Sequence, residues 1–127
     1  MTFSNEYRKL LKKVAADERL AEFVGPAKEA GEALSQLTMH LAAKGSKDQE
    51  LAVAIASEYL NVFGYVTFVF SWLHQCLAAI DRDDAFGKTK IKMARFFFRH
   101  VLPSIEGHKQ IVLHGKDAIM DFDESEF

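Results

Sequence analysis

Residues 92–103 read KMARFFFRHVLP, a stretch that places three adjacent phenylalanines, Phe96, Phe97 and Phe98, ahead of Pro103. In a helix, neighbouring side chains are about 100° apart around the axis, so three consecutive rings point in three directions. The rings cannot all face one core. We therefore expect at least one of them to be covered by another helix, another domain or another subunit.

The composition indicates a folded domain with more apolar surface than its own core needs. The chain has 127 residues, of which 49% are hydrophobic, and it contains eleven Phe, three Tyr and one Trp. This length suits a single domain over residues 1–127, and the hydrophobic content is enough for a substantial core. So many aromatic residues exceed the usual need of a small solvated bundle, which favours an additional contact surface.

Charge and cysteine content narrow the possible functions. The formal net charge is −2, whereas nucleic-acid-binding domains are normally strongly basic, so we expect no nucleic-acid partner. The only cysteine, Cys76, excludes an internal disulfide and a Cys-rich zinc site, and it fits a cytoplasmic protein. No signal-peptide pattern is visible near the start, and the most apolar window, residues 62–73, is shorter than the roughly 20 residues of a membrane span.

Helical periodicity runs through nearly the whole chain and is interrupted by two predicted loops, residues 44–47 and 81–87. Three long legs result. The first leg has an apolar face with Tyr7 and Val14 and is interrupted at Gly25-Pro26, where proline predicts either a kink or a split into two helices. The third leg is interrupted at Pro103 and continues in an apolar seam of Ile105, His108, Val112, Gly115, Ile119 and Phe122.

The second leg, residues 48–80, changes character along its length. Residues 62–73 read VFGYVTFVFSWL and are apolar all round, a pattern that β-propensity alone would also allow in a buried strand. No turn signal separates the window from its helical flanks, so we predict a central helix. The predicted fold is all-α: an up-down bundle of three long legs, two of them broken near Pro26 and Pro103, with four to five helices if the prolines reverse the chain.

Several segments in order resemble one family. They read EYLNVFGYV at 58–66, ARFFF at 94–98, VLP at 101–103 and GKDAIM at 115–120, followed by the acidic end at 121–127. This series resembles the C-terminal helical domain of one subgroup of acyl-CoA dehydrogenases, and it covers most of the chain, least clearly over the first 20 residues.

The resemblance implies an appendage that follows the flavin-containing body of an enzyme oxidising acyl-CoA to enoyl-CoA. In that family the catalytic carboxylate and the FAD-binding segments lie upstream, in a body that this sequence does not contain. No catalytic or cofactor-binding residue is therefore carried over, and FAD is expected in the parent enzyme only. The chain is then either a fragment or engineered domain of such an enzyme, or a separate gene product that docks onto one.

A search of the residues for independent chemistry gives the same answer. No glutamate is followed three residues later by a histidine, as di-iron bundles require, and no Gly-rich phosphate loop or nucleophile-elbow motif occurs. His100, His108 and His114 are spaced by eight and six residues, which does not suit one metal on a helix, so we predict no metal site. For His108, on the apolar seam, we favour a neutral histidine bonded to a neighbour.

A basic stripe precedes and includes the phenylalanines, with Lys88, Lys92, Arg95 and Arg99 spaced along one helix face. It could contact CoA phosphates or an acidic partner, but we favour a solvated face or pairing with the acidic C-terminal residues. The candidate interface consists of Phe96, Phe97, Phe98, Arg95 and Arg99.

Gly64 and Ser71 lie in the apolar window. A glycine within a helix costs about 1 kcal/mol relative to alanine, so we expect a closely packed neighbouring backbone there, with space for an acyl chain as the alternative.

These observations lead to three hypotheses. The first is a non-catalytic accessory and assembly domain of an FAD-dependent acyl-CoA dehydrogenase, which contacts the dehydrogenase body, a second copy, or both. The second is a free-standing helical module for dimerisation or interaction. The third is a small-molecule-binding bundle with a site near Trp72 and Gly64, for which acyl-CoA would be the ligand.

Overall fold

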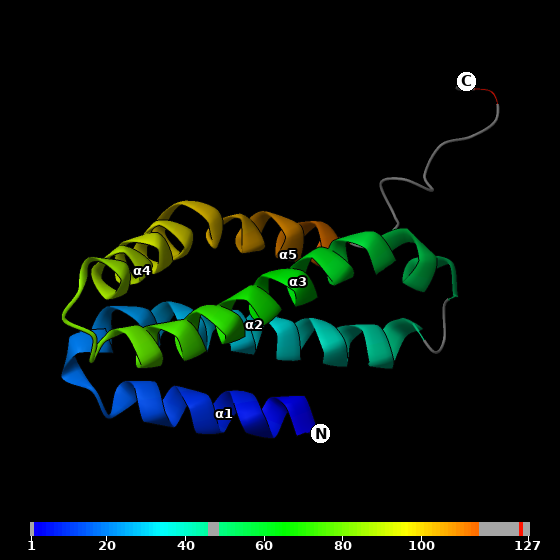
Figure 1. Cartoon of the computed structure of the whole chain (residues 1–127). Coiled ribbons are helices and arrows are strands. Elements are labelled where there is room, and N and C mark those ends of the chain that lie inside the picture. Colours follow the sequence, from blue (N-terminus) through cyan, green and yellow to red (C-terminus); the bar gives the residue numbers. More distant parts are fainter. Residues whose placement is uncertain (1, 46–48, 115–124, 126–127) are drawn as a thin grey trace.

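The computed structural model describes residues 2–45, 49–114 and 125, and in that part of the chain every regular element is helical. Figure 1 shows that successive rods run in alternating directions and that the last two helices form one rod together. The prediction of an all-α up-down bundle is confirmed. The elements are α1 (Thr2–Ala15), η1 (Glu18–Leu20), α2 (Ala21–Gly45), α3 (Gln49–Ala79), α4 (Ala85–Phe96), η2 (Phe97–Val101) and α5 (Ser104–His114).

The first leg is split into two antiparallel helices, but not at Pro26. The chain reverses between Ala15 and Ala21, where Asp17 accepts a hydrogen bond from the Arg19 amide at 3.0 Å and starts the short η1 turn. Pro26 lies inside α2, so of the two alternatives stated for this residue, the split into two helices is wrong. Gly25 helps explain why α2 continues through Pro26, because a residue without a Cβ avoids part of the clash with the ring of a following proline.

The third leg is interrupted at Pro103, as predicted, but it does not reverse there. After α4 the chain widens into a π-helical turn, η2, which closes with a 2.8 Å hydrogen bond from the Leu102 amide to the Phe97 carbonyl. α5 then starts at Ser104, directly after Pro103, and continues in the same general direction (Figure 1). The bundle therefore has four rods rather than three, and the fourth is the bent pair α4–α5.

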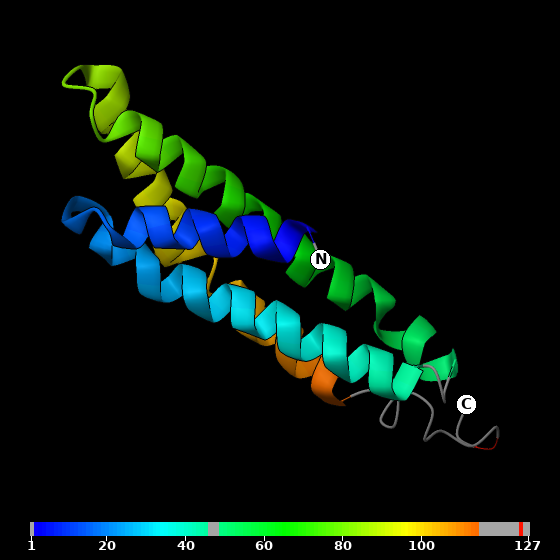
Figure 2. The same cartoon turned by 90° about the horizontal axis from the view of Figure 1, so that it is seen from below.

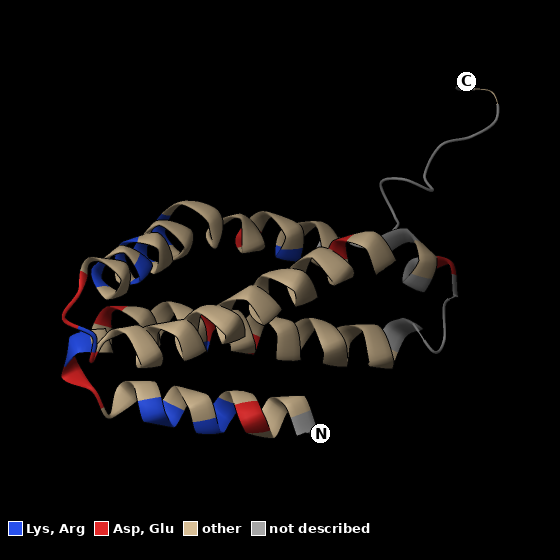
Figure 3. Cartoon of the chain, in the orientation of Figure 1, with Lys and Arg blue, Asp and Glu red and all other residues tan. Residues whose placement is uncertain are grey.

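Two turns meet at one end of the bundle and are tied together by Arg19. Its guanidinium contacts Asp17 at 2.7 Å in the α1–α2 turn and Asp81 at 2.9 Å in the α3–α4 turn. In Figure 3, acidic and basic positions are coloured in both turns at this end of the bundle. The ion pairs are exposed, so their contribution to stability is small, but they fix which turns are neighbours.

The α3–α4 turn is shorter than the predicted loop at 81–87. Asp84 caps α4 by accepting a hydrogen bond from the Gly87 amide at 2.9 Å, and the helix already begins at Ala85. A Cβ at Gly87 would lie 2.6 Å from Cβ of Arg82 and 2.9 Å from the Ala79 carbonyl oxygen. This glycine therefore permits the close approach of α3 to α4. Of the other predicted loop, residues 46–48 lie outside the described ranges, and α2 ends at Gly45.

α3 is the central helix, because it packs against α1, α2, α4 and α5. One stripe of its surface is almost completely buried, whereas Val53 and Leu60 on the opposite side are exposed. Figure 2 shows α3 along one edge of the bundle. The prediction of a central helix is confirmed, but it is not enclosed on every side. The buried stripe consists of Val62, Val66, Val69, Leu73 and Cys76.

The length argument against a membrane span does not hold for this helix. Within α3, residues Ala56–Ala79 form a largely apolar segment of 24 residues with a mean hydropathy of 1.3, which is long enough to cross a bilayer, and 33% of it is buried in the bundle. One such helix is weak support for a span, because the core helix of a globular bundle has the same length and composition.

Helix α1 closes the core on one side of α3. Tyr7 is the main contact: its ring packs on Gly31 of α2, and its hydroxyl donates a 2.6 Å hydrogen bond to the Ala27 carbonyl. Burial raises the pKa of Tyr7, so the hydroxyl stays protonated. Phe3 at the start of the same helix packs against Phe63 and Phe70 of α3.

Candidate interaction surface

The three phenylalanines point in three directions, as their spacing predicts. Phe97 is 7% exposed and packs against Phe68 and Trp72 of α3. Phe98 is 6% exposed, and its ring centroid lies 5.0 Å from that of Phe23 in α2. Phe96 is 61% exposed and contacts only His100 among the described aromatic rings. Two of the three candidate interface rings thus belong to the internal core, and Phe96 is the one on the surface.

The two candidate interface arginines are drawn to a single carboxylate. Arg95 binds Glu22 of α2 in a bidentate pair, with Nε–Oε1 and Nη2–Oε2 distances of 2.6 and 2.8 Å. Arg99 lies 3.8 Å from the same carboxylate. Hydrogen bonding from Arg95 lowers the pKa of Glu22, so the pair stays ionised and joins α4 to α2.

The remaining stripe residues lie along α4 (Figure 3). Lys88 and Lys92 are exposed, while Lys90 donates to Gln75 of α3 at 3.2 Å and stands over the rings of Trp72 and Phe86. The stripe is thus divided between side chains that contact other helices, among them the unpredicted pair of Arg95 with Glu22, and the exposed Lys88 and Lys92. The alternative partners, the acidic residues at 117–124 and 126, lie outside the described ranges.

His108 is held by a carboxylate rather than left free. Its Nδ1 forms a hydrogen bond with Oε2 of Glu58, which joins α5 to α3, and its ring packs on Tyr65. Both side chains of the pair are partly exposed. The prediction that this histidine bonds to a neighbour is confirmed, and no nucleophilic serine or cysteine is among the contacts described for it.

Cys76 is an unreactive core residue. Its side chain is 1% exposed, and burial, with a smaller effect of the Glu22 charge, raises the pKa of the thiol to about 11. A thiol of this kind remains protonated near neutral pH and is a poor nucleophile. Among the described residues, no group of three or more His, Cys, Asp or Glu side chains is placed to hold a metal ion.

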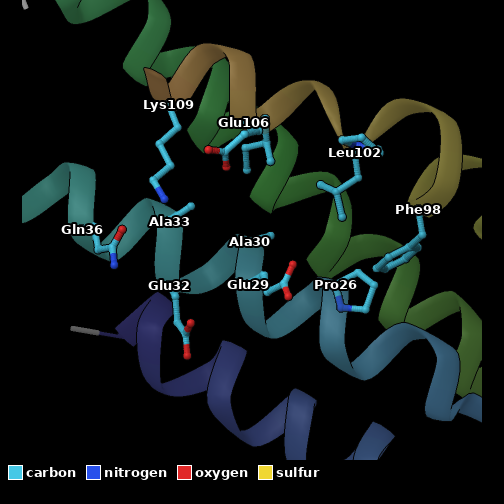
Figure 4. A pocket seen from close by; sticks show the side chains of 12 residues that line it. Pro26, Glu29, Ala30, Glu32, Ala33, Gln36, Phe98, Leu102, Glu106 and Lys109 are labelled. Atoms are coloured by element: carbon cyan, nitrogen blue, oxygen red, sulfur yellow. The ribbon is translucent and has the colours of Figure 1, made fainter. Parts of the chain in front are cut away.

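A groove of about 480 Å³ lies between α2 and the bend from η2 to α5. Figure 4 shows apolar side chains on its floor, including Ala30, Phe98 and Leu102, and charged side chains at its edge. The floor residues are already almost fully buried, so a ligand would gain little additional apolar contact. The edge carries Glu29, Glu32 and Glu106 with Lys109, a charge balance that opposes the phosphates of CoA or of a flavin nucleotide.

The third hypothesis placed a small molecule near Trp72 and Gly64. Neither residue lines the groove, and Trp72 packs against Phe97. Gly64 faces open space, because a Cβ built there meets no atom within 4 Å. The closely packed backbone expected at this glycine is therefore not supplied by residues 2–45 or 49–114.

Residues 3–123 match a known protein family, described as "Acetyl-CoA dehydrogenase C-terminal like". Because the match covers nearly the whole chain, the protein belongs to this family. No curated protein matches it significantly. The family resemblance drawn from the segments at 58–66, 94–98 and 101–103 is confirmed.

Proposed function

We propose that this chain is a non-catalytic accessory and assembly domain of an FAD-dependent acyl-CoA dehydrogenase. The family match over residues 3–123 carries the proposal. The parent reaction would be the oxidation of acyl-CoA to enoyl-CoA, with FAD bound by the dehydrogenase body. The acidic edge of the described groove opposes the phosphates of FAD and CoA, in keeping with a site for both in the dehydrogenase body rather than in this groove.

The surface of the domain supports an assembly role. Large apolar side chains are exposed on several helices, including Leu60 at 66%, Phe68 at 58% and Phe96 at 61%. Monomeric proteins rarely leave so many large apolar residues uncovered on neighbouring elements, so this surface favours association with a dehydrogenase body, with a second copy, or with both. We place the assembly in the cytoplasm, in keeping with the single reduced cysteine.

Activity measurements test the proposal directly. The purified chain, incubated with FAD, a series of acyl-CoA thioesters and an artificial electron acceptor, is expected to show neither bound flavin absorbance nor enoyl-CoA formation. Flavin binding together with turnover would overturn the non-catalytic role.

The second candidate function, a free-standing interaction module, is favoured by the same exposed apolar residues, since they require a partner but not a flavin enzyme. The reading frame distinguishes the two. A dehydrogenase body encoded in the same frame, or a neighbouring dehydrogenase that co-purifies with the chain, supports the accessory domain. Full solubility and function without any dehydrogenase partner would favour the independent module.

A further inference from the structure

The outward side of α3 carries a regular seam that the bundle leaves uncovered. Its members follow one another at intervals of 4, 3, 4, 3, 4 and 7 residues, the spacing of a helix that packs along another helix. Val53 is 79% exposed and Leu60 66%, and the smaller members are exposed as well, apart from the half-buried Gly64. This outer seam consists of Val53, Ser57, Leu60, Gly64, Thr67, Ser71 and Ala78.

The composition of the outer seam suits contact with another uncharged surface. Between Glu58 and Asp81 the sequence contains no Asp, Glu, Lys or Arg. The hydroxyl of Thr67 donates to the Phe63 carbonyl at 2.9 Å, and that of Ser71 accepts from Gln75 at 3.2 Å. Because the Thr67 hydroxyl already donates within its own helix, another helix can cover it without leaving that donor unsatisfied.

Gly64, at the middle of the seam, has no close neighbour among the described residues that would require a glycine. Gly31 and Gly87 are each in close contact with their own chain, with the Tyr7 ring and with the Ala79–Arg82 turn, whereas an added Cβ at Gly25, Gly64 or Gly107 meets no atom within 4 Å. Of these three open glycines, only Gly64 lies on the outer seam. A helical glycine costs about 1 kcal/mol relative to alanine, and at Gly64 nothing in the described structure offsets that cost. A second helix that approaches closely at this point would do so.

We infer that the outer seam docks a second copy of this chain, with the two α3 helices packed antiparallel about a two-fold axis near Gly64 and Thr67. The placement of the large residues supports a second copy: the two large members, Val53 and Leu60, both precede Gly64, and only small members follow it. Antiparallel pairing then places Leu60 against Ser71 of the other copy and Val53 against Ala78. Two identical uncharged faces are also electrostatically compatible, as an isologous interface requires.

The flanks of the seam extend the same surface. Phe63 on one side is 42% exposed and Phe68 on the other is 58% exposed, so a second α3 would be bordered by aromatic rings on both sides. At 1.5 Å per residue, the seam from Val53 to Ala78 is roughly 38 Å long. This inference rests on the assembly role proposed above and specifies its partner and surface.

Light scattering on the wild-type chain and on Gly64→Glu tests the inference. At micromolar concentration the wild-type chain is expected to have twice the chain mass of 14.3 kDa. Gly64→Glu places a charge at the centre of the contact and is expected to weaken dimerisation at least about 100-fold. The matched control is Gly107→Glu in α5, another helical glycine with no atom within 4 Å of an added Cβ, and it is expected to remain dimeric.

Cross-linking tests the orientation of the two copies. A mixture of Leu60→Cys and Ser71→Cys chains is expected to give mainly the mixed disulfide upon oxidation, since the two positions face each other only in the antiparallel pair. The native Cys76 is buried and does not compete. Preferential formation of Leu60→Cys homodimers would overturn the antiparallel arrangement.

The failure of this inference is distinguishable from failure of the proposed function. A wild-type monomer, a dimer unaffected by Gly64→Glu, or a monomer that instead binds neutral phosphatidylcholine vesicles would each overturn the dimer. None of these results produces acyl-CoA dehydrogenation, which is the outcome that overturns the accessory role.

Discussion

At the scale of single residues, sequence spacing determines that the three phenylalanine rings diverge, whereas packing between helices determines which rings are buried. Three adjacent helical residues must diverge, and they do. Which ring enters the core depends on the rotation of α4 against its neighbours, and that rotation is set by contacts such as Phe98 with Phe23, far away in the sequence. The sequence therefore predicted that the rings cannot share one core and that at least one needs another partner, but it could not identify Phe96 as the exposed ring.

Truncating the rings one at a time measures this division. Phe98→Ala is expected to lower the free energy of unfolding by about 3–5 kcal/mol, because it leaves a cavity between α2 and η2. Phe96→Ala, at the exposed position, is expected to change it by no more than about 0.5 kcal/mol. Urea denaturation of both variants checks the pair, and similar losses in the two would contradict the placement of the rings.

A second pair of variants tests the contact between Tyr7 and Gly31. Gly31→Ala would bring a Cβ to 2.9 Å from Cε1 of Tyr7, whose ring cannot move freely because its hydroxyl is bonded to Ala27. We expect a destabilisation of about 1–3 kcal/mol from overpacking. Gly107→Ala has open space and is expected to stabilise α5 by up to about 1 kcal/mol. Thermal unfolding followed by circular dichroism compares them, and a stabilised Gly31→Ala would contradict the contact.

At the scale of elements, the helix pattern and α3 as one long helix could be predicted, but the first reversal of the chain could not. Proline was the stronger signal for a break, yet Gly25 removes part of the steric reason for a break at Pro26. The weaker signal, Asp17 followed by Glu18, marks the actual turn, since aspartate caps a helix start and an acidic residue favours its first turn. Cap chemistry was the better guide here than proline.

The cap of α4 gives the fold a predictable response to acid. Hydrogen bonds from Arg82, and then from the Gly87 amide, lower the pKa of Asp84 from 3.8 to about 2. A lowered pKa means that the carboxylate stabilises the fold above about pH 4 and that this contribution is lost as the pH falls toward 2. Asp84→Asn keeps a capping side chain without the charge, so its stability is expected to fall less steeply over this range.

Urea denaturation at several pH values between 2 and 6 measures this difference. Arg82→Gln removes the main cause of the lowered Asp84 pKa. It is therefore also expected to make the loss of stability between about pH 4 and pH 2 less steep. An unchanged slope in Asp84→Asn would show that the cap does not contribute to the acid response.

At the scale of the whole molecule, the bonds between distant helices were beyond prediction. Glu22 and Arg95 are 73 positions apart, and Glu58 and His108 are 50 apart, so no local sequence pattern predicts either pair. The outer seam of α3 was different, because its regular spacing and lack of charge are visible in the sequence. It was overlooked because the all-round apolar character of the helix suggested complete burial.

The contribution of α1 can be tested by removing it. This helix buries Tyr7, Leu10 and Val14, each worth about 1.5–3 kcal/mol, and the sum is comparable with the whole stability of a small domain. A chain lacking residues 2–16 is expected to lose cooperative thermal unfolding and to aggregate. The exposed-site control Arg8→Ala should behave as wild type. Cooperative unfolding of the shortened chain would show that α2–α5 fold independently.

The buried thiol of Cys76 is a built-in probe for the opening of the helical bundle. Its sulfur lies in the completely covered stripe of α3, and its raised pKa keeps it protonated, so a thiol reagent in solution can reach it only when the helices separate. The rate of its chemical labelling therefore counts opening events without any added probe. Followed at increasing protein concentration, the same rate would report whether association of copies keeps the domain closed for longer.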